Sequence, residues 1–408
     1  MNSPEPVIYR WRHWHALVTA FAALVLISLG GLVTSHGVGM AVPDWPNSYG
    51  YNMFFFPVSQ WVGGIFYEHT HRLAGTVVGF LTLVLTLGLH GRAARPWLRA
   101  GSGVLLLGGL TWAVFTSGRK DWAFLACATG TVGLLVSWFW PRGEPASAAL
   151  RWLGNLALVL VIAQGVLGGL RVVLMQDAIG ILHATLAQLF LGLIGVVALL
   201  TSPWWWRWRV DPSQPLSRLG PVRGLIVGTS LLILMQLVIG ASMRHRHAGL
   251  AIPDFPLAHG RLWPSTTPEA IARYNRDRPE ARALNAVSAT DVQLHMVHRM
   301  TGVGVMVLLV VTAVGARRRL GAGHVLTRCT GLWAGLGVLQ LLLGALTVWT
   351  NKSADIATAH VTVGSLLLLG GACLSLMACR RGVWAARPMV QELSMLSAPL
   401  ASSARPTS

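Results

Sequence analysis

The chain has 408 residues, of which 53% are hydrophobic and only 11% are charged. Soluble domains carry about a quarter charged residues, so this composition excludes an ordinary water-soluble protein. The net charge of +18 would indicate nucleic-acid binding in a soluble protein. Here the arginines lie in the connections between apolar segments, as the positive-inside rule describes for membrane proteins, and we expect no nucleic-acid partner.

Ten apolar segments are each long enough, or nearly so, to cross a bilayer as a helix. They comprise residues 16–35, 69–90, 99–116, 121–140, 152–170, 179–202, 223–243, 292–315, 327–349 and 355–379. Because only helices and closed barrels satisfy the backbone in lipid, these segments predict an all-α polytopic membrane protein surrounded by membrane lipid. Arginine is concentrated in alternate connections, which places both termini in the cytoplasm and the long loop 244–291 outside.

The sequence contains an internal repeat. Ala-Val-Pro-Asp-Trp-Pro at 41–46 recurs as Ala-Ile-Pro-Asp-Phe-Pro at 251–256, within longer matching stretches at 30–46 and 240–256. Three further matches follow in the same order in both halves: His71-Arg72 with His298-Arg299, 164–169 with 340–345, and Asp177 to His183 with Asp355 to His360. This order predicts a tandem duplication that forms two pseudo-symmetric four-helix transmembrane bundles in the same membrane orientation.

The repeat sets the expected domain boundaries. Residues 1–210 would form the N-terminal bundle, residues 211–390 the C-terminal bundle, and residues 391–408 a flexible cytoplasmic tail. The two apolar segments at about 99–140 have no counterpart in the second half and are joined by a short polar turn. We interpret them as an inserted transmembrane hairpin that brings the total to about ten spans and has no chemistry of its own.

Four histidines occupy repeat-related positions near the start of apolar segments, namely His71, His183, His298 and His360. All four segments run from outside to inside, so at 1.5 Å per residue each histidine lies within roughly 10 Å of the outer end. Two facing histidines at equal depth in a four-helix bundle suit ligation of a haem iron. A core histidine bonded to a backbone carbonyl is the alternative for each one. Zinc is disfavoured because no compact group of three or four ligands appears.

Glu68 lies three residues before His71 and therefore on the same helix face. Ionisable side chains inside a hydrophobic span are costly, so they mark either a functional site or a satisfied pair. The counterpart of Glu68 in the second half is His295. This difference predicts that the first half carries out chemistry and that the second half supports it. The alternative is that Glu68 only bonds the backbone at the start of its helix.

Other polar residues near these positions give weaker signals. Arg72 and Arg299 directly follow their histidines, and each is expected either to bind a haem propionate or to extend toward lipid headgroups. His69, two residues from His71, would face away from it and pack or line the rim of the site. Four more histidines belong to the outer connections and are interpreted as solvated loop residues, with a place at the rim of a site as the alternative: His36, His245, His247 and His259.

Together these motifs resemble the haem A synthase family. The stretches that carry the resemblance are 30–46, 68–75, 164–171, 183–188, 298–302 and His360. They cover nearly the whole chain except 99–140 and the C-terminal tail. The resemblance implies a pseudo-twofold membrane protein of two four-helix bundles in the bacterial cytoplasmic (inner) membrane. Such an enzyme oxidises a methyl group of haem O to the formyl group of haem A for cytochrome oxidase assembly.

By position, the resemblance assigns Glu68, His71 and His183 to a substrate haem O site, and His298 and His360 to a haem b cofactor. The methyl group would be hydroxylated twice, and the geminal diol would lose water to give the aldehyde. Glu68 would transfer protons or stabilise positive charge on the methyl carbon. The implied partners are haem O synthase, a ferredoxin-like electron carrier and cytochrome oxidase assembly factors.

Two other functions compete with this one. A di-haem b-type membrane cytochrome that relays electrons would bind two permanent haems and would not need Glu68. A proton-coupled transporter built on parallel repeats would use the histidines and Glu68 as its site, but it predicts polar groups near the middle of the membrane. The polar groups here cluster toward one surface, which disfavours the transporter.

Overall fold

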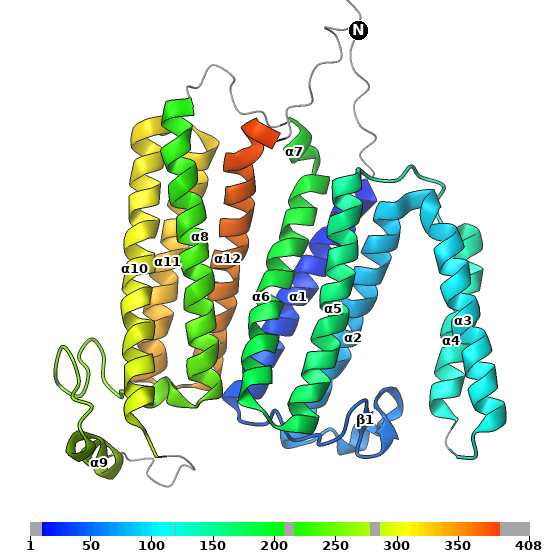
Figure 1. The fold of residues 1–408 in the computed structure, drawn as a ribbon, viewed down its shortest axis with the longest axis horizontal. Helices are drawn as coiled ribbons and strands as arrows, with labels where there is room; N and C mark the ends of the chain where they lie inside the picture. The colour runs from blue at the N-terminus through cyan, green and yellow to red at the C-terminus, as the bar shows by residue number, and fades with distance from the viewer. Residues whose placement is uncertain (1–9, 119, 208–215, 278–285, 384–408) are drawn as a thin grey trace, which may run out of the picture.

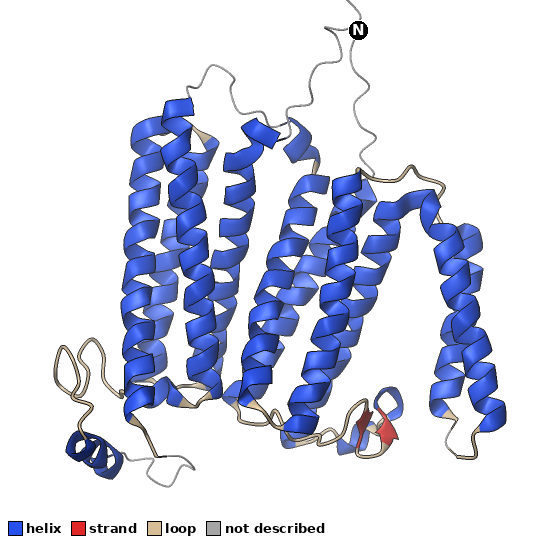
Figure 2. Ribbon diagram, in the orientation of Figure 1, coloured by secondary structure: helices blue, strands red, loops and turns tan. Residues whose placement is uncertain are grey.

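The computed structural model describes residues 10–118, 120–207, 216–277 and 286–383. These residues are helical apart from loops and one two-stranded ribbon, and most helices run side by side (Figure 1, Figure 2). The long helices are α1 (Arg10–Ser35), α2 (Gly63–His90), α3 (Ala94–Phe115), α4 (Asp121–Phe139), α5 (Ala148–Leu174), α6 (Asp177–Thr201), α8 (Leu216–His245), α10 (Ala289–Leu320), α11 (Val325–Trp349) and α12 (Ala354–Val383). The short elements are α7 (Pro203–Arg207), α9 (Pro268–Asp277), β1 (Asn47–Ser48), β2 (Tyr51–Asn52) and the 3-10 turns η1 (Met53–Phe55), η2 (Val58–Gln60), η3 (Gly91–Ala93) and η4 (Ala248–Leu250).

The prediction of an all-helical, multi-pass membrane protein is confirmed. Each of the ten predicted apolar segments overlaps one long helix. Nine candidate membrane spans are found among the described residues, because α2 and α3 together make one candidate of 53 residues, Gly63–Phe115. The chain reverses direction between these two helices at η3, as Figure 1 shows.

The helices contact one another in two rings of four. In the first ring the contacts run from α1 to α2, α5 and α6 and back to α1, and in the second from α8 to α10, α11 and α12 and back to α8. The rings meet where α12 contacts α1 and α6, and where α6 contacts α8. Helices α3 and α4 pack closely on each other, touch the rest of the described chain mainly at α2 and η3, and stand at one side of the molecule in Figure 1.

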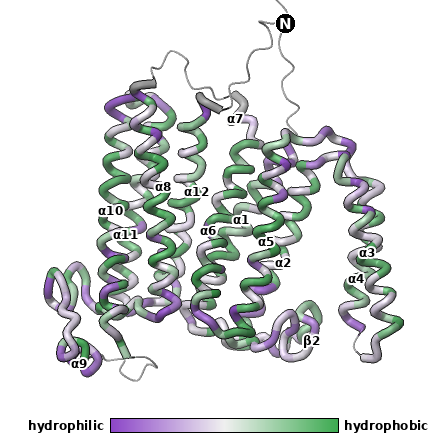
Figure 3. The backbone as a smooth tube through the Cα atoms, viewed as in Figure 1, coloured by the Kyte–Doolittle hydropathy of each residue, from purple (hydrophilic) through white to green (hydrophobic). Residues whose placement is uncertain are grey.

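The outer faces of the helices expose large apolar side chains. Phe21, Phe80 and Leu332 are 68%, 64% and 78% exposed, and Figure 3 shows hydrophobic residues along the helices with hydrophilic ones mostly near their ends. Water would oppose this exposure by about 25 cal/mol per Å², whereas lipid chains do not. The interior is filled by branched side chains such as Ile194 and Val197 of α6, a helix of the first ring that also contacts α8 and α12 of the second.

The connections at one end of the molecule, where Figure 1 shows β1 and α9, are folded. The ribbon of β1 and β2 belongs to the connection that joins α1 to α2. The longer connection between α8 and α10 has a small core of its own, in which Ile252 and Tyr274 pack with Val292 at the start of α10. Helices α2, α6, α10 and α12, which carry the four candidate histidines, all begin at this end.

Gly91 provides a test of the turn between α2 and α3. It has a positive φ of +57°, and a Cβ atom there would clash with the carbonyl oxygen of Gly143. We expect Gly91→Ala to lower the free energy of unfolding by about 1–3 kcal/mol, measured by denaturant unfolding in detergent. In Gly101→Ala of α3 the new Cβ meets nothing within 4 Å, so stability should change by about 0.5 kcal/mol or less. Equal stabilities for the two variants would contradict this account of the turn.

Candidate functional site

Each of the four candidate histidines lies against a glycine of the helix that precedes its own in the ring. A Cβ atom added to that glycine would come within 3.0–3.3 Å of the imidazole Cε1 atom, which is tighter than an ordinary contact. The pairs are Gly30 with His71, Gly168 with His183, Gly240 with His298, and Gly344 with His360. Glycine therefore lets each ring fit between two helices, and the same arrangement occurs four times.

A glutamine lies one helical turn before three of these glycines, at Gln164, Gln236 and Gln340. The Nε2 atom of Gln236 donates to the carbonyl oxygen of His298 at 2.9 Å and lies 3.2 Å from its Nδ1 atom. Gln164 donates to the carbonyl oxygen of its own histidine at 3.0 Å, and Gln340 Nε2 lies 3.4 Å from the Nε2 of its histidine. These contacts were not predicted, although the Gln-x-x-x-Gly spacing places both residues on one helix face.

The second pair of histidines has the spacing of two ligands of one iron. Imidazole nitrogens bind metal ions at about 2 Å, so two rings on opposite sides of one ion have centres roughly 6–7 Å apart. The ring centres of His298 and His360 are 6.4 Å apart, and the ring planes make an angle of 65°. The residues present at this position therefore fit a haem iron between them.

His71 and His183 form the corresponding pair in the first ring. They are close enough for the charge of one to act on the other. The Nδ1 atoms of His71, His183 and His360 are buried and meet no hydrogen-bond partner in good geometry within the described ranges, although the backbone carbonyls of Leu26, Gln164 and Gln340 lie near the three rings. Buried ring nitrogens without a protein partner are uncommon, so these imidazoles are suited to hold a ligand.

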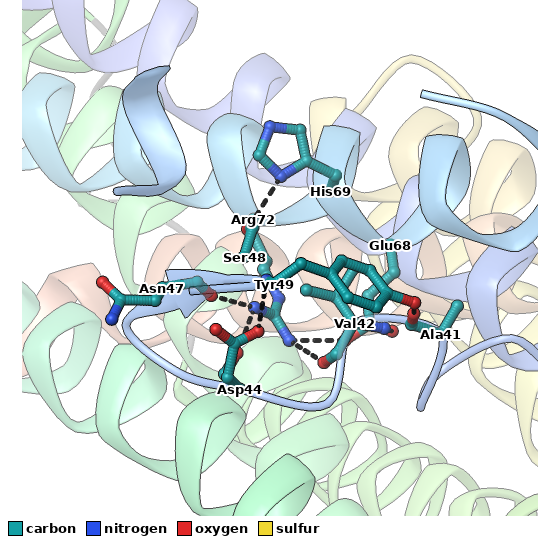
Figure 4. Close-up of polar contacts among 9 residues, drawn as sticks. All are labelled: Ala41, Val42, Asp44, Asn47, Ser48, Tyr49, Glu68, His69 and Arg72. Carbon is teal, nitrogen blue, oxygen red and sulfur yellow. Dashed lines mark hydrogen bonds and ion pairs between the residues drawn. The ribbon is translucent and has the colours of Figure 1, made fainter. Parts of the chain in front are cut away.

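Glu68 is buried, and protein groups occupy both of its carboxylate oxygens (Figure 4). Its Oε2 accepts from the backbone N–H of Val42 at 2.9 Å, and its Oε1 pairs with Nη2 of Arg72 at 2.7 Å. These contacts are the ones expected if Glu68 has a structural role at the start of α2. A catalytic role for Glu68 stays a prediction.

The side chain of Arg72 binds backbone carbonyl oxygens of the connection between α1 and α2 (Figure 4). Its Nη1 donates to the carbonyl oxygens of Asp44 and Asn47 at 2.6 and 3.0 Å. Its Nη2 donates to the carbonyl oxygen of Val42 at 2.6 Å and to Glu68 at 2.7 Å. All four terminal N–H groups are thereby used, which leaves only Nε–H for the expected haem propionate.

Arg299 makes the corresponding contacts in the second half. Its Nη1 donates to the carbonyl oxygen of Leu257 at 2.9 Å, and its Nη2 donates to those of Ile252 and Asp254 at 3.3 and 2.8 Å. These acceptors are the repeat counterparts of the ones that Arg72 binds, so the repeat extends to individual hydrogen bonds. Both arginines thus stabilise an outer loop, and a propionate contact stays a prediction for each.

In each outer loop, an aspartate accepts hydrogen bonds from two backbone N–H groups of the same loop. Asp254 accepts from the backbone N–H groups of His259 and Gly260 at 2.7 and 2.8 Å, and Asp44 makes the same two bonds in the first loop, both at 2.7 Å. Burial acts to raise the pKa of Asp254, but the two N–H donors and the nearby His259 outweigh burial and lower that pKa below its ordinary value. The ionised carboxylate therefore stabilises the loop.

Two of the outer histidines are not solvated, and our expectation for them was wrong. His245 is the last residue of α8, is only 7% exposed, and packs its ring against Gly180 of α6. It is buried because α8 extends beyond its apolar segment and lies against the first ring. His259 is half-buried and stacks on Tyr274 of α9 with ring centres 3.5 Å apart. The exposed members of the group, as expected, are His36 and His247.

His69 is a packing residue, as predicted. It is fully buried on the side of α2 that faces β1, and its Nδ1 lies 3.2 Å from Oγ of Ser48 (Figure 4). Its ring packs edge-on against Trp61 with ring centres 4.6 Å apart. His295, the counterpart of Glu68, is also buried, at 3% exposure. An imidazole thus stands in the second half where the first has a carboxyl group.

Comparison with known proteins decides the family. A family model described as cytochrome oxidase assembly protein (COX15-CtaA) matches residues 124–371. The chain belongs to this family. A protein of Geobacillus kaustophilus named heme A synthase is 24% identical over 382 residues, which cover 90% of this chain and 91% of the relative. Proteins of the same name from Halalkalibacterium halodurans and Novosphingobium aromaticivorans are 26% and 27% identical, over 57% and 58% of this chain and 70% and 66% of the relatives.

The resemblance to haem A synthase that the motifs indicate is thereby confirmed at the level of the family. Membership implies an oxidoreductase connected with haem and with cytochrome oxidase assembly, at low sequence identity. The matched region includes α5 and α6 of the first ring and nearly all of the second ring, and it contains three of the four candidate histidines, His183, His298 and His360.

The lowered pKa of Asp254 predicts how the second outer loop responds to acid. Because the pKa is lower in the folded loop than in an unfolded chain, ionised Asp254 stabilises the loop above its ordinary pKa of about 3.9. This contribution is lost as the pH falls through the lowered value. We expect hydrogen exchange in residues 254–260, corrected for its intrinsic pH dependence, to lose protection below about pH 4.

Asp254→Asn is the control for this measurement. An amide cannot supply the charge, so protection in the variant should already be reduced at pH 6 and should change little in acid. Wild-type protection that stays constant through pH 3 would contradict the role given to Asp254.

Proposed function

We propose that the protein is a haem A synthase that oxidises a methyl group of haem O to a formyl group by two successive hydroxylations in the membrane. The observation that carries the proposal is the 6.4 Å between the ring centres of His298 and His360, as ligation of one iron requires. The family match and the relatives named heme A synthase support it. The formyl product would serve the assembly of cytochrome c oxidase.

We assign His298 and His360 to a haem b cofactor, and His71 and His183 to the substrate haem O. Haem supplies the redox chemistry when it is bound. The protein holds the iron from two helices, and the glycine opposite each ring lets the imidazole lie between helix backbones. The apolar helices around both pairs exclude water from the reacting groups.

Within this proposal Glu68 stabilises charge rather than transferring a proton. Its partners, the Val42 N–H and the Arg72 guanidinium, are both donors, and together they fix the positions of its two oxygens. A carboxylate fixed one helical turn before His71 supplies negative charge where positive charge would develop on the substrate methyl carbon. Because its donors already hold it in place, it needs no rearrangement during the reaction.

The finer architecture belongs to the same proposal. We assign residues 1–210 to the substrate bundle and residues 211–390 to the haem b bundle, related by pseudo-twofold symmetry, with an inserted hairpin at about 99–140 and about ten spans. The two rings of helix contacts and the matching arginine bonds support this division. The tail 391–408 lies outside the described residues.

The surroundings of the protein follow from the same proposal. We assign both termini to the cytoplasmic side of a bacterial inner membrane, because arginine is concentrated in the connections on that side. The proposed partners are haem O synthase as the source of substrate, a ferredoxin-like electron carrier, and cytochrome oxidase assembly factors.

A di-haem b-type cytochrome that only relays electrons is the second candidate. One observation favours it: Glu68 is fully engaged by the loop and by Arg72, so it has a structural role that requires no chemistry. The proton-coupled transporter has no such support, because the candidate histidines all lie near the start of their helices.

Haem extraction with mass analysis separates the two candidates. The full-length protein is expressed together with haem O synthase, as wild type and as Glu68→Gln. The synthase predicts haem A or its hydroxylated precursor in the wild type and about 100-fold less product in the variant, since a fixed charge is lost from the site. Haem b should be retained in both proteins.

Asp44→Asn is the matched control, because it weakens the same loop but leaves Glu68 in place. This variant should keep most of the product. Haem b alone in the wild type, despite available haem O, would make the electron relay the better account. If no haem at all is extracted, the four histidines do not bind haem, and their role is structural.

The contact between Gly344 and His360 predicts a specific effect on the second haem. Gly344→Ala places a Cβ atom 3.1 Å from the His360 ring and forces it to move. Overpacking of about 1–3 kcal/mol would weaken haem binding roughly 5- to 150-fold. The measurement is haem content and the visible and EPR spectra of the purified protein. Gly335→Ala on the same helix meets nothing within 4 Å and should behave as wild type; identical spectra for both variants would argue against ligation by His360.

A further inference from the structure

Arg171 is a guanidinium without a protein partner close to the candidate substrate site. It lies in the last turn of α5 and is half-buried. Its side chain makes no hydrogen bond or ion pair with any residue that the structure describes, although Nη2 lies so close to Gly39 that a Cβ there would come within 3.0 Å. Unmet donors of a partly buried arginine cost free energy, so this side chain is suited to an external anion.

The acids near Arg171 do not neutralise it. The charges of Glu68 and Asp177 act on it from a distance. However, both oxygens of Glu68 already have partners, and Asp177 is exposed to solvent. The charge of Arg171 in turn acts on the two candidate ligands His71 and His183. The unpaired cation is therefore a neighbour of the histidine pair in the first ring.

Arg244 brings a second positive charge to the same place from the other ring. It lies in the last turn of α8 and reaches across to α1, where Nη2 donates to the carbonyl oxygen of Gly31 and, at 2.5 Å, to the hydroxyl of Ser35. Its Nε is buried and has no hydrogen-bond partner in the described part of the chain. Arg171 and Arg244 lie near enough for their like charges to repel, and an anion between them would remove this repulsion.

These two cations depart from the repeat. The counterpart of Arg171 in the second half is Thr347, and the counterpart of Arg244 in the first half is Thr34. The loop arginines Arg72 and Arg299, in contrast, are repeated with their hydrogen bonds. The extra positive charge is therefore not part of the shared scaffold. Arg171 lies beside the first histidine pair, and Arg244 lies near Arg171 but between the two pairs, since its charge also acts on His360.

We propose that Arg171 and Arg244 bind a carboxylate of the porphyrin held by His71 and His183, that is, a propionate side chain. This inference rests on the proposed function, which places a porphyrin at that pair. Arg171 accepts the carboxylate through its terminal N–H groups, and Arg244, fixed to α1, supplies the second charge. Because α8 belongs to the second ring, the first site is complete only when the two rings are docked.

Binding of haemin and of haemin dimethyl ester, which lacks both carboxylates, tests the proposal on the purified full-length protein. Binding at the first site is defined as the absorbance change that His71→Ala removes. In the wild type we expect haemin to bind this site at least about tenfold more tightly than the ester. Arg171→Gln should weaken the binding of haemin by a similar factor and leave the binding of the ester unchanged. Arg171→Lys should retain part of the preference for haemin over the ester.

Arg273→Gln is the matched control, because it removes one exposed cation from α9 at the same end of the molecule. It should keep the full preference for haemin. An unchanged absorbance of the second site, at His298 and His360, shows in each variant that the helices remain assembled.

Three outcomes would overturn the proposal. An undiminished preference for haemin in Arg171→Gln would exclude the carboxylate site but leave the porphyrin site intact. If Arg171→Gln keeps the preference for haemin but loses a co-purified phospholipid, as seen by mass spectrometry, then Arg171 binds the phosphate of a lipid headgroup instead. If His71→Ala and His183→Ala leave the binding of both porphyrins unaltered, the proposed function of the first site fails, and this inference fails with it.

Discussion

Every polar side chain placed between these helices must find its partner there, because lipid supplies none. An imidazole is too large to fit between two closely packed helices that both carry side chains at the contact. Glycine on the facing helix removes the Cβ, as at Gly240 beside His298, and the ring lies against the backbone. Gln236, one turn earlier on the same helix, then supplies an N–H group to that histidine. The glycine and the glutamine together therefore first meet the requirement of burying an imidazole between helices.

The outer loops meet the same requirement with arginine. A loop that folds over a helix end buries carbonyl oxygens that need donors, and guanidinium supplies several in a fixed plane. Because Arg72 directly follows His71, the same helical turn fixes both the loop and the candidate ligand. Glu68 adds a bond to the loop backbone from the adjacent turn. A shift of the loop must therefore disturb the histidine, which makes the loops part of the site rather than a cover for it.

The features that depend on periodicity and repetition could be predicted, and those that depend on contact between distant residues could not. The spans follow from runs of apolar residues, and the four histidines stand out because the repeat aligns them. Nothing in the order of residues indicates that Arg72 binds loop carbonyls, since snorkelling or an anion would suit an arginine there equally well. The burial of His245 arises only where α8 meets α6, and hydropathy places that residue in a loop.

The two halves share their scaffold but differ in charge, and this difference bears on what each can do. Glycine–histidine contacts, loop arginines and closing aspartates occur in both. Glu68 and Arg171, in contrast, lie beside the first pair, and Arg244 lies near Arg171 although its charge also acts on His360 of the second pair. A permanent cofactor needs ligation and apolar packing alone. A substrate must be oriented in the same way at each turnover, and its reacting carbon develops charge, so fixed charges act on it selectively. An electron relay between two equivalent haems would gain nothing from such an asymmetry, which therefore favours chemistry in the first half.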